Sequence, residues 1–94
     1  MEGSVSKVCT QLLQQLASAE KFISAASEDR KIKTNDCMAQ SLRCAISASV
    51  LTIEDAVALA TAINLSIFSA DTKTMLVNFA TDSATHGEEV VLCL

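Results

Sequence analysis

Residues 5–26 read VSKVCTQLLQQLASAEKFISAA, and apolar side chains recur there at alternating spacings of four and three residues. This repeat is that of the a and d positions of three heptads, which line one narrow face of a helix. A face of this kind packs against another helix. We call it the heptad seam, and its members are Val5, Cys9, Leu12, Leu16, Ala19, Ile23 and Ala26.

The polar run 28–36 separates this first helix from a second helix, which we expect over residues 36–50. The run contains neither Gly nor Pro, so it is either a loop or a frayed extension of a helix. The side chain of Thr34, Asn35 or Asp36 then caps the second helix.

A third helix is predicted over residues 53–68. Thr52 provides a hydroxyl cap, and Glu54 and Asp55 follow it in the positively polarised first turn. After Asp55 the next charged residue is Asp71. A helix that is almost wholly apolar is expected at the centre of a fold.

A fourth helix is predicted to end before Gly87, which suits the left-handed position that follows a helix. The tail 88–94 is either one helical turn or a short strand, and a strand would need a partner edge. The sequence therefore predicts an all-α protein with one domain, residues 1–94. The expected fold is a compact bundle of about four helices, roughly 5–27, 36–50, 53–68 and 71–86, with a short C-terminal tail.

Composition argues against nucleic-acid and membrane partners. The net charge is −4 with only seven Lys and Arg, whereas phosphate binding needs clustered basic residues. The longest uncharged apolar stretch, 56–70, is shorter than the about 20 residues that span a membrane. No secretory signal precedes the four cysteines, so we expect reduced thiols in a cytoplasmic protein.

No residue pattern predicts catalysis, a metal or a cofactor. Cys37 and Cys44 share a helix face about 10 Å apart, which is too far for one zinc ion. Asp82 and His86 stand four residues apart, but nothing places a thiol beside them. We therefore expect a protein that is not an enzyme, with cysteines that serve as small buried hydrophobes.

A helix-turn-helix is a less favoured alternative. Residues 57–66 are somewhat like its first helix and turn, and the next helix would enter the major groove of DNA. That helix offers only Lys73 and Asn78 for DNA contacts and has no Arg, which is little for phosphate positioning or base readout.

Half of the residues are apolar, which is a high share for a small monomer and favours association. Our leading hypothesis is a non-enzymatic interaction module that self-associates, with a homodimer favoured, and acts by binding a partner protein as an adaptor, inhibitor or chaperone. Leu13 and Phe22 lie beside the heptad seam and widen it. The predicted interface comprises Val5, Cys9, Leu12, Leu13, Leu16, Phe22 and Ile23.

The alternative hypothesis is a helical oligomer that binds a small, anionic ligand between subunits. Basic side chains would supply charge, and Asn64 stands in the most apolar segment, where an unpaired amide costs about 1–3 kcal/mol. Asn64 either pairs with a hydroxyl, faces a turn, specifies an interface or points into a cavity. The candidate ligand contacts are Arg30, Lys31, Lys33, Arg43 and Asn64.

Overall fold

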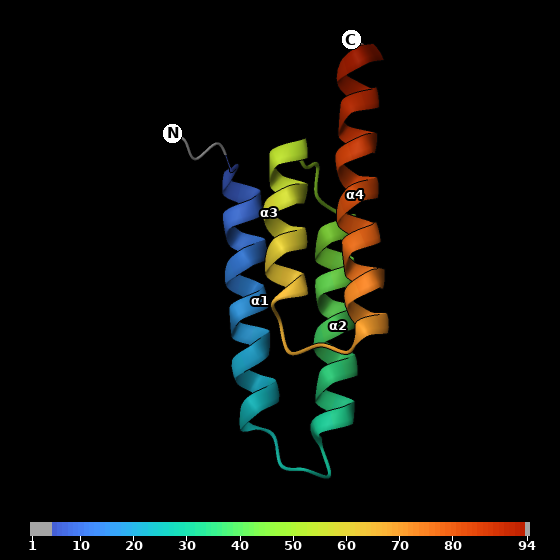
Figure 1. Ribbon diagram of the computed structural model, residues 1–94. Coiled ribbons are helices and arrows are strands. Elements are labelled where there is room, and N and C mark those ends of the chain that lie inside the picture. Colours follow the sequence, from blue (N-terminus) through green and yellow to red (C-terminus); the bar gives the residue numbers. More distant parts are fainter. Residues whose placement is uncertain (1–4, 94) are drawn as a thin grey trace.

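The computed structural model describes the backbone of residues 5–93 and the side chains of residues 5–85. Within these limits the chain is all-α and forms a bundle of four helices, which confirms the predicted fold class (Figure 1). The helices are α1 (Lys7–Ala25), α2 (Lys31–Ser47), α3 (Ile53–Asn64) and α4 (Ala70–Cys93).

The helices form two antiparallel hairpins that pack against each other. α1 contacts α2 and α3, and α4 contacts α3 and α2. α1 and α3 run side by side in the same direction, so their N-termini lie at the same end of the bundle (Figure 1). α4 has 24 residues and α3 has 12, so α4 extends well past the start of α3.

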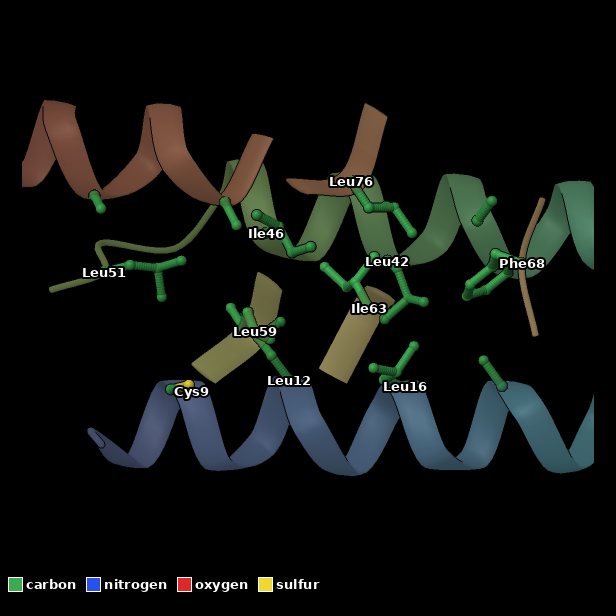
Figure 2. Packing of buried hydrophobic residues seen from close by; sticks show 14 of the residues in the cluster. Cys9, Leu12, Leu16, Leu42, Ile46, Leu51, Leu59, Ile63, Phe68 and Leu76 are labelled. Carbon is green, nitrogen blue, oxygen red and sulfur yellow. The ribbon is translucent and has the colours of Figure 1, made fainter. Parts of the chain in front are cut away.

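Five of the seven residues of the heptad seam pack inside their own chain. Cys9, Leu12, Leu16, Ala19 and Ile23 are all buried and belong to one core cluster with residues of the other helices. Figure 2 shows Cys9, Leu12 and Leu16 on the side of α1 that faces those helices. A face with a 3.5-residue repeat therefore meets its partner helices within one chain. The core residues opposite it are Ala39, Leu42, Ile46, Leu51, Leu59, Ile63, Phe68, Leu76, Ala80 and Ala84.

α2 starts earlier than predicted and also ends earlier, because it covers Lys31–Ser47 rather than 36–50. Thr34, Asn35 and Asp36 lie inside the helix, so the prediction that one of them caps it is wrong. Arg30 occupies the N-cap position and makes no side-chain cap hydrogen bond. The polar run contains no Gly or Pro, so nothing in it prevents helix formation one turn sooner.

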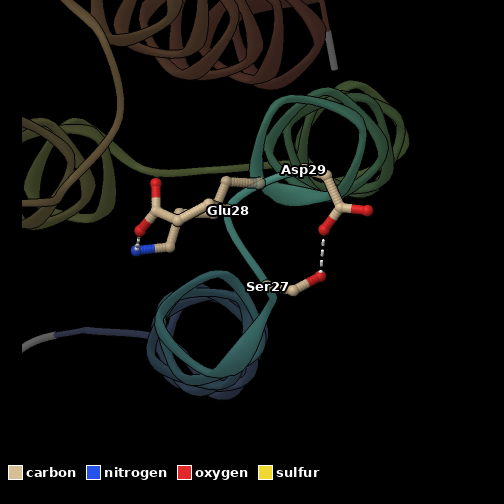
Figure 3. Close-up of polar contacts among 4 residues, drawn as sticks. Ser27, Glu28 and Asp29 are labelled. Carbon is tan, nitrogen blue, oxygen red and sulfur yellow. Dashed lines mark hydrogen bonds and ion pairs between the residues drawn. The ribbon is translucent and has the colours of Figure 1, made fainter.

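Side-chain contacts stabilise the short connection between α1 and α2. The Ser27 hydroxyl donates to the Asp29 carboxylate over 2.6 Å, and Lys31 Nζ lies 3.4 Å from the Glu28 carboxylate (Figure 3). Short side-chain hydrogen bonds of this kind favour turns over continued helix.

α3 ends at Asn64, four residues before the predicted end, and it is not central. The Ser66 hydroxyl donates to the Ile63 carbonyl, and the chain then turns so that Phe68 enters the core. Because α3 contacts only α1 and α4, one of its faces stays open to solvent.

α4 continues through Gly87 to Cys93, so the predicted helix end at Gly87 is wrong and the tail up to Cys93 is helical. A glycine within a helix costs only about 0.5–1 kcal/mol relative to alanine, which the flanking turns offset. The side chains of His86 and the residues that follow it lie outside the described part, and so does the proposed pair of Asp82 with His86.

Candidate functional site

The most connected polar group is a cluster of Ser6, Cys9, Thr52 and Asp55, which we call the Asp55 cluster. It lies where the N-termini of α1 and α3 meet. Asp55 Oδ1 accepts from the Ser6 backbone N–H over 2.9 Å. Asp55 Oδ2 accepts from the Ser6 hydroxyl over 2.8 Å and from the Thr52 backbone N–H over 3.1 Å.

Each helix start in this cluster is also capped by its own hydroxyl. Ser6 Oγ accepts from the Cys9 N–H over 3.2 Å at the start of α1. Thr52 Oγ1 accepts from the Asp55 N–H over 3.0 Å, which confirms the predicted hydroxyl cap, and with Asp55 it forms a capping box at the start of α3. The link between Ser6 and Asp55 spans 49 residues of sequence, so no local pattern announces it.

Burial disfavours the charged form of Asp55, yet the hydrogen bonds from Ser6 and Thr52 outweigh that effect and lower the pKa below its ordinary 3.8. Both carboxylate oxygens are occupied by donors, and the side chain has no exposed surface. Asp55 is therefore an ionised structural group that joins two helix starts.

The Cys9 thiol is buried beside this carboxylate and donates to the Asp55 backbone carbonyl over 3.6 Å. Burial, the Asp55 charge and the hydrogen bond to Asp55 raise the pKa of Cys9 to about 11. The thiol therefore stays protonated at neutral pH and is a poor nucleophile. The hydrogen bonds of the cluster join the start of α1 to the start of α3.

Four of the seven predicted interface residues lie in the core of the chain itself. Cys9, Leu12, Leu16 and Ile23 are covered by the other helices, so a second copy could reach them only if the bundle opened. The other three lie at or near the surface: Val5 and Phe22 are exposed, and Leu13 is partly buried.

The five predicted ligand contacts do not come together. Arg30 and Lys33 line one hollow of about 550 Å³, and Lys31 lines another. Arg43 stands 5.5 Å from the centre of the Phe79 ring, on the side of α2 that faces α4. Asn64 is exposed, so its amide is free to bind water and the expected burial cost does not arise.

Two of the cysteines are not the small buried hydrophobes that we expected from the sequence. Cys37 and Cys44 are exposed on α2, and Cys9 alone of the three described cysteines is buried. Among residues with placed side chains, no three His, Cys, Asp or Glu residues come close enough to hold a metal ion together.

The geometry of α3 and α4 differs from a helix-turn-helix. The two helices run antiparallel along one another, whereas the DNA-binding motif crosses its helices at about 90–120° (Figure 1). The candidate DNA-reading helix buries Leu76 and Ala80 in the bundle, and Lys73 is partly buried.

The sequence did not predict the exposed apolar surface on α3. Ile53 is 52% exposed, Val57 61% and Leu65 81%. With the exposed Thr61 and Asn64 they form one face, which we call the α3 outer face. The sequence did show that this helix is apolar on nearly all sides, and we therefore expected it at the centre of the fold. A four-helix bundle has no central position, so one apolar side of α3 faces solvent.

Within the described residues, no helix combines the length and the apolar character that crossing a membrane requires. Comparison with known proteins finds no family model, no curated protein and no solved structure that matches this chain.

Proposed function

We propose that this chain is a non-enzymatic helical interaction module that self-associates as a homodimer and acts by binding a partner protein. The observation that supports the proposal is the α3 outer face, where large apolar side chains are exposed along one side of a helix. Exposed apolar patches on small proteins commonly mark protein contacts.

The chemistry of this face suits an apolar helix of the partner. Ile53, Val57 and Thr61 follow one another at intervals of four residues, so their side chains form a row along one side of α3. Glu54 is the only charged residue on the exposed side of α3. In a chain of net charge −4, a face with a single carboxylate fits the apolar side of an amphipathic helix better than a charged surface.

The Asp55 cluster supports a role outside catalysis. The buried carboxylate already accepts three hydrogen bonds, and the neighbouring thiol stays protonated. A general base or nucleophile needs a free lone pair directed at a substrate. Asp55 and Cys9 instead form hydrogen bonds that hold the starts of α1 and α3 together.

Site-specific photo-crosslinking in cells tests the proposal. A photoreactive residue at Val57 should give a discrete adduct with one protein, identified by mass spectrometry. The matched control is the same residue at Asn78, which is exposed on the polar side of α4. Equal adducts from both positions, or none from Val57, would contradict the proposal.

A small anionic ligand between subunits is the alternative proposal, with Arg30 and Lys33 as its basic pair. Native mass spectrometry of protein taken directly from cells tests it, because a retained ligand adds a constant mass to each oligomer. We also propose a cytoplasmic location, where the exposed thiols of Cys37 and Cys44 stay reduced.

A further inference from the structure

The side of α2 that points away from the core carries a row of mostly short side chains. Ala39, Leu42 and Ile46 are buried on its inner side. The residues on the outer side are all exposed, and we call them the α2 outer stripe: Lys33, Cys37, Gln40, Ser41, Cys44 and Ala48. Among the described helices α2 contacts only α1 and α4, and neither covers this stripe.

Two opposite charges flank the stripe on its α4 side. Arg43 stands over the Phe79 ring of α4, its Nε donates to Gln40 Oε1 over 2.8 Å, and its Nη2 lies 3.7 Å from Cys44 Sγ. Asp36 is exposed on the same side of the helix, about 10 Å further along it. Neither Asp36 nor Arg43 forms an ion pair with another residue whose side chain is described. They are too far apart to pair with each other on one helix.

The thiols and the charges repeat at the same interval of seven residues. Cys37 precedes Cys44 by two turns, as Asp36 precedes Arg43. A second α2 that runs antiparallel, across a twofold axis beside Gln40, therefore meets both pairs at once. Each Cys37 faces the other copy's Cys44, and each Asp36 comes beside the other copy's Arg43. A parallel arrangement would set like charges against each other, so the charges select the antiparallel one.

The short side chains allow two α2 helices to approach closely. Packed helix axes lie about 8–10 Å apart, and Cα atoms stand about 2.3 Å from their own axis. At an axis separation of about 10 Å, facing Cα atoms are about 5 Å apart, which is within the range of about 4.4–6.8 Å that a disulfide spans. Lys33 of each copy then lies beside the C-terminal end of the other α2, at Ala48, where a cation is favoured.

We propose that two copies associate through the α2 outer stripe, antiparallel across a twofold axis, with Cys37 of each copy opposite Cys44 of the other. The proposal rests on the self-association proposed above and specifies its surface. Because both copies use the same surface, the contact closes at a dimer. α3 does not contact α2, so the α3 outer face stays free for a partner protein.

Disulfide trapping tests this arrangement in a full-length chain that carries Cys93→Ser, with oxidised glutathione as the oxidant. One thiol attacks glutathione disulfide and releases a reduced glutathione, and the facing thiol then displaces the second glutathione as the protein disulfide forms. Non-reducing electrophoresis should show a dimer, and mass spectrometry should show that Cys37 is joined to Cys44.

Variants with a single stripe cysteine give the matched control. Adding Cys37→Ser, or separately Cys44→Ser, should abolish the disulfide-linked dimer, because identical residues of the two copies lie about 10 Å apart across the axis. Mixing these two variants should restore it, since Cys44 of one chain then meets Cys37 of the other.

Charge reversal tests the flanking pairs. Asp36→Lys and Arg43→Glu should each slow disulfide formation by about threefold to tenfold at low salt, because like charges then meet twice in each dimer. The double variant should recover the original rate, since the charges are exchanged. Lys21→Glu on α1 is the control outside the stripe and should leave the rate unchanged. Circular dichroism of each variant separates loss of contact from loss of folding.

Two results would overturn the α2 contact while leaving self-association in place. One is a product that joins Cys37 to Cys37 or Cys44 to Cys44. The other is no disulfide-linked dimer from a chain that sedimentation equilibrium shows to be dimeric when reduced. A reduced chain that stays monomeric at all concentrations would overturn both proposals. Partner binding at the α3 outer face would still be decided separately by crosslinking from Val57.

Discussion

At the scale of single residues, Asp55 serves two helices at once. It completes the capping box of α3 with Thr52 and accepts two further hydrogen bonds from Ser6 at the start of α1. Cys9 fills the space beside it as a buried, protonated thiol. The polar and apolar parts of the bundle therefore meet at this carboxylate, and its removal affects both helix starts.

Asp55→Asn should lower the free energy of unfolding by about 2–4 kcal/mol, because a neutral amide cannot accept all three hydrogen bonds. Urea denaturation followed by circular dichroism measures the loss. Glu54→Gln is the matched control, since Glu54 is exposed and its replacement should change stability by less than about 0.5 kcal/mol. Equal effects of the two substitutions would show that the Asp55 cluster contributes little.

The contribution of Asp55 should depend on pH in a defined direction. Its pKa is lower in the folded chain than the ordinary 3.8, so the unfolded chain binds more protons in acid. The stabilisation is complete above that ordinary value and is lost as pH falls through the folded-state pKa. Urea denaturation across this acid range should show the difference between wild type and Asp55→Asn shrinking. A constant difference would contradict the assignment.

The three described cysteines should differ strongly in reactivity. Cys37 and Cys44 are exposed and should react with iodoacetamide in the folded protein, whereas Cys9 should react only after unfolding. Mass spectrometry of peptides after timed labelling, with and without urea, measures this. Rapid labelling of Cys9 in the folded chain would show that α1 opens locally.

Since the pKa of Cys9 is raised from 9.0 to about 11, the stability that it provides should decline as pH rises through that range.

At the scale of elements, helix ends depend on more than local signals. Thr52 caps α3 as its sequence predicts, and it forms a capping box with Asp55, because both partners lie within one turn. Gly87 fits the usual pattern of a helix end, yet α4 passes through it. A glycine permits the left-handed conformation but does not require it, so the flanking residues decide.

Gly87→Ala should increase the helical signal in far-ultraviolet circular dichroism and should stabilise the chain by up to about 1 kcal/mol. Alanine loses less conformational entropy than glycine in a helix. Thermal denaturation at a low protein concentration measures the effect on one chain. A clear loss of stability would mean that residue 87 adopts the left-handed conformation in solution.

At the scale of the whole molecule, the two hairpins place most of the heptad seam inside and leave the α3 outer face uncovered. The bundle is elongated, with extents of 50 × 25 × 18 Å. Four short helices leave each helix with only two neighbours, so part of every helix surface faces solvent. Association is proposed on those surfaces rather than on the seam.

Leu16→Ala should lower the free energy of unfolding by about 2–5 kcal/mol, because it opens a cavity in the core of a single chain. Phe22→Ala should cost less than about 1 kcal/mol, since Phe22 is 64% exposed. Urea denaturation at low and at high protein concentration measures both. The cost of Leu16→Ala should be the same at each concentration, and a cost that vanished on dilution would place the seam between copies.

The sequence alone determines the all-α class, the approximate number of helices and the buried side of α1. These features follow from local periodicity, which the backbone geometry of a helix imposes on Leu12, Leu16 and Ile23. Only the tertiary structure decides what each face meets. Cys9 and Cys37 are the same residue type on similar helices, yet one is buried and the other exposed, because burial depends on neighbours that are distant in the chain. The same reason places apolar α3 at the surface and brings Ser6 to Asp55 across 49 residues.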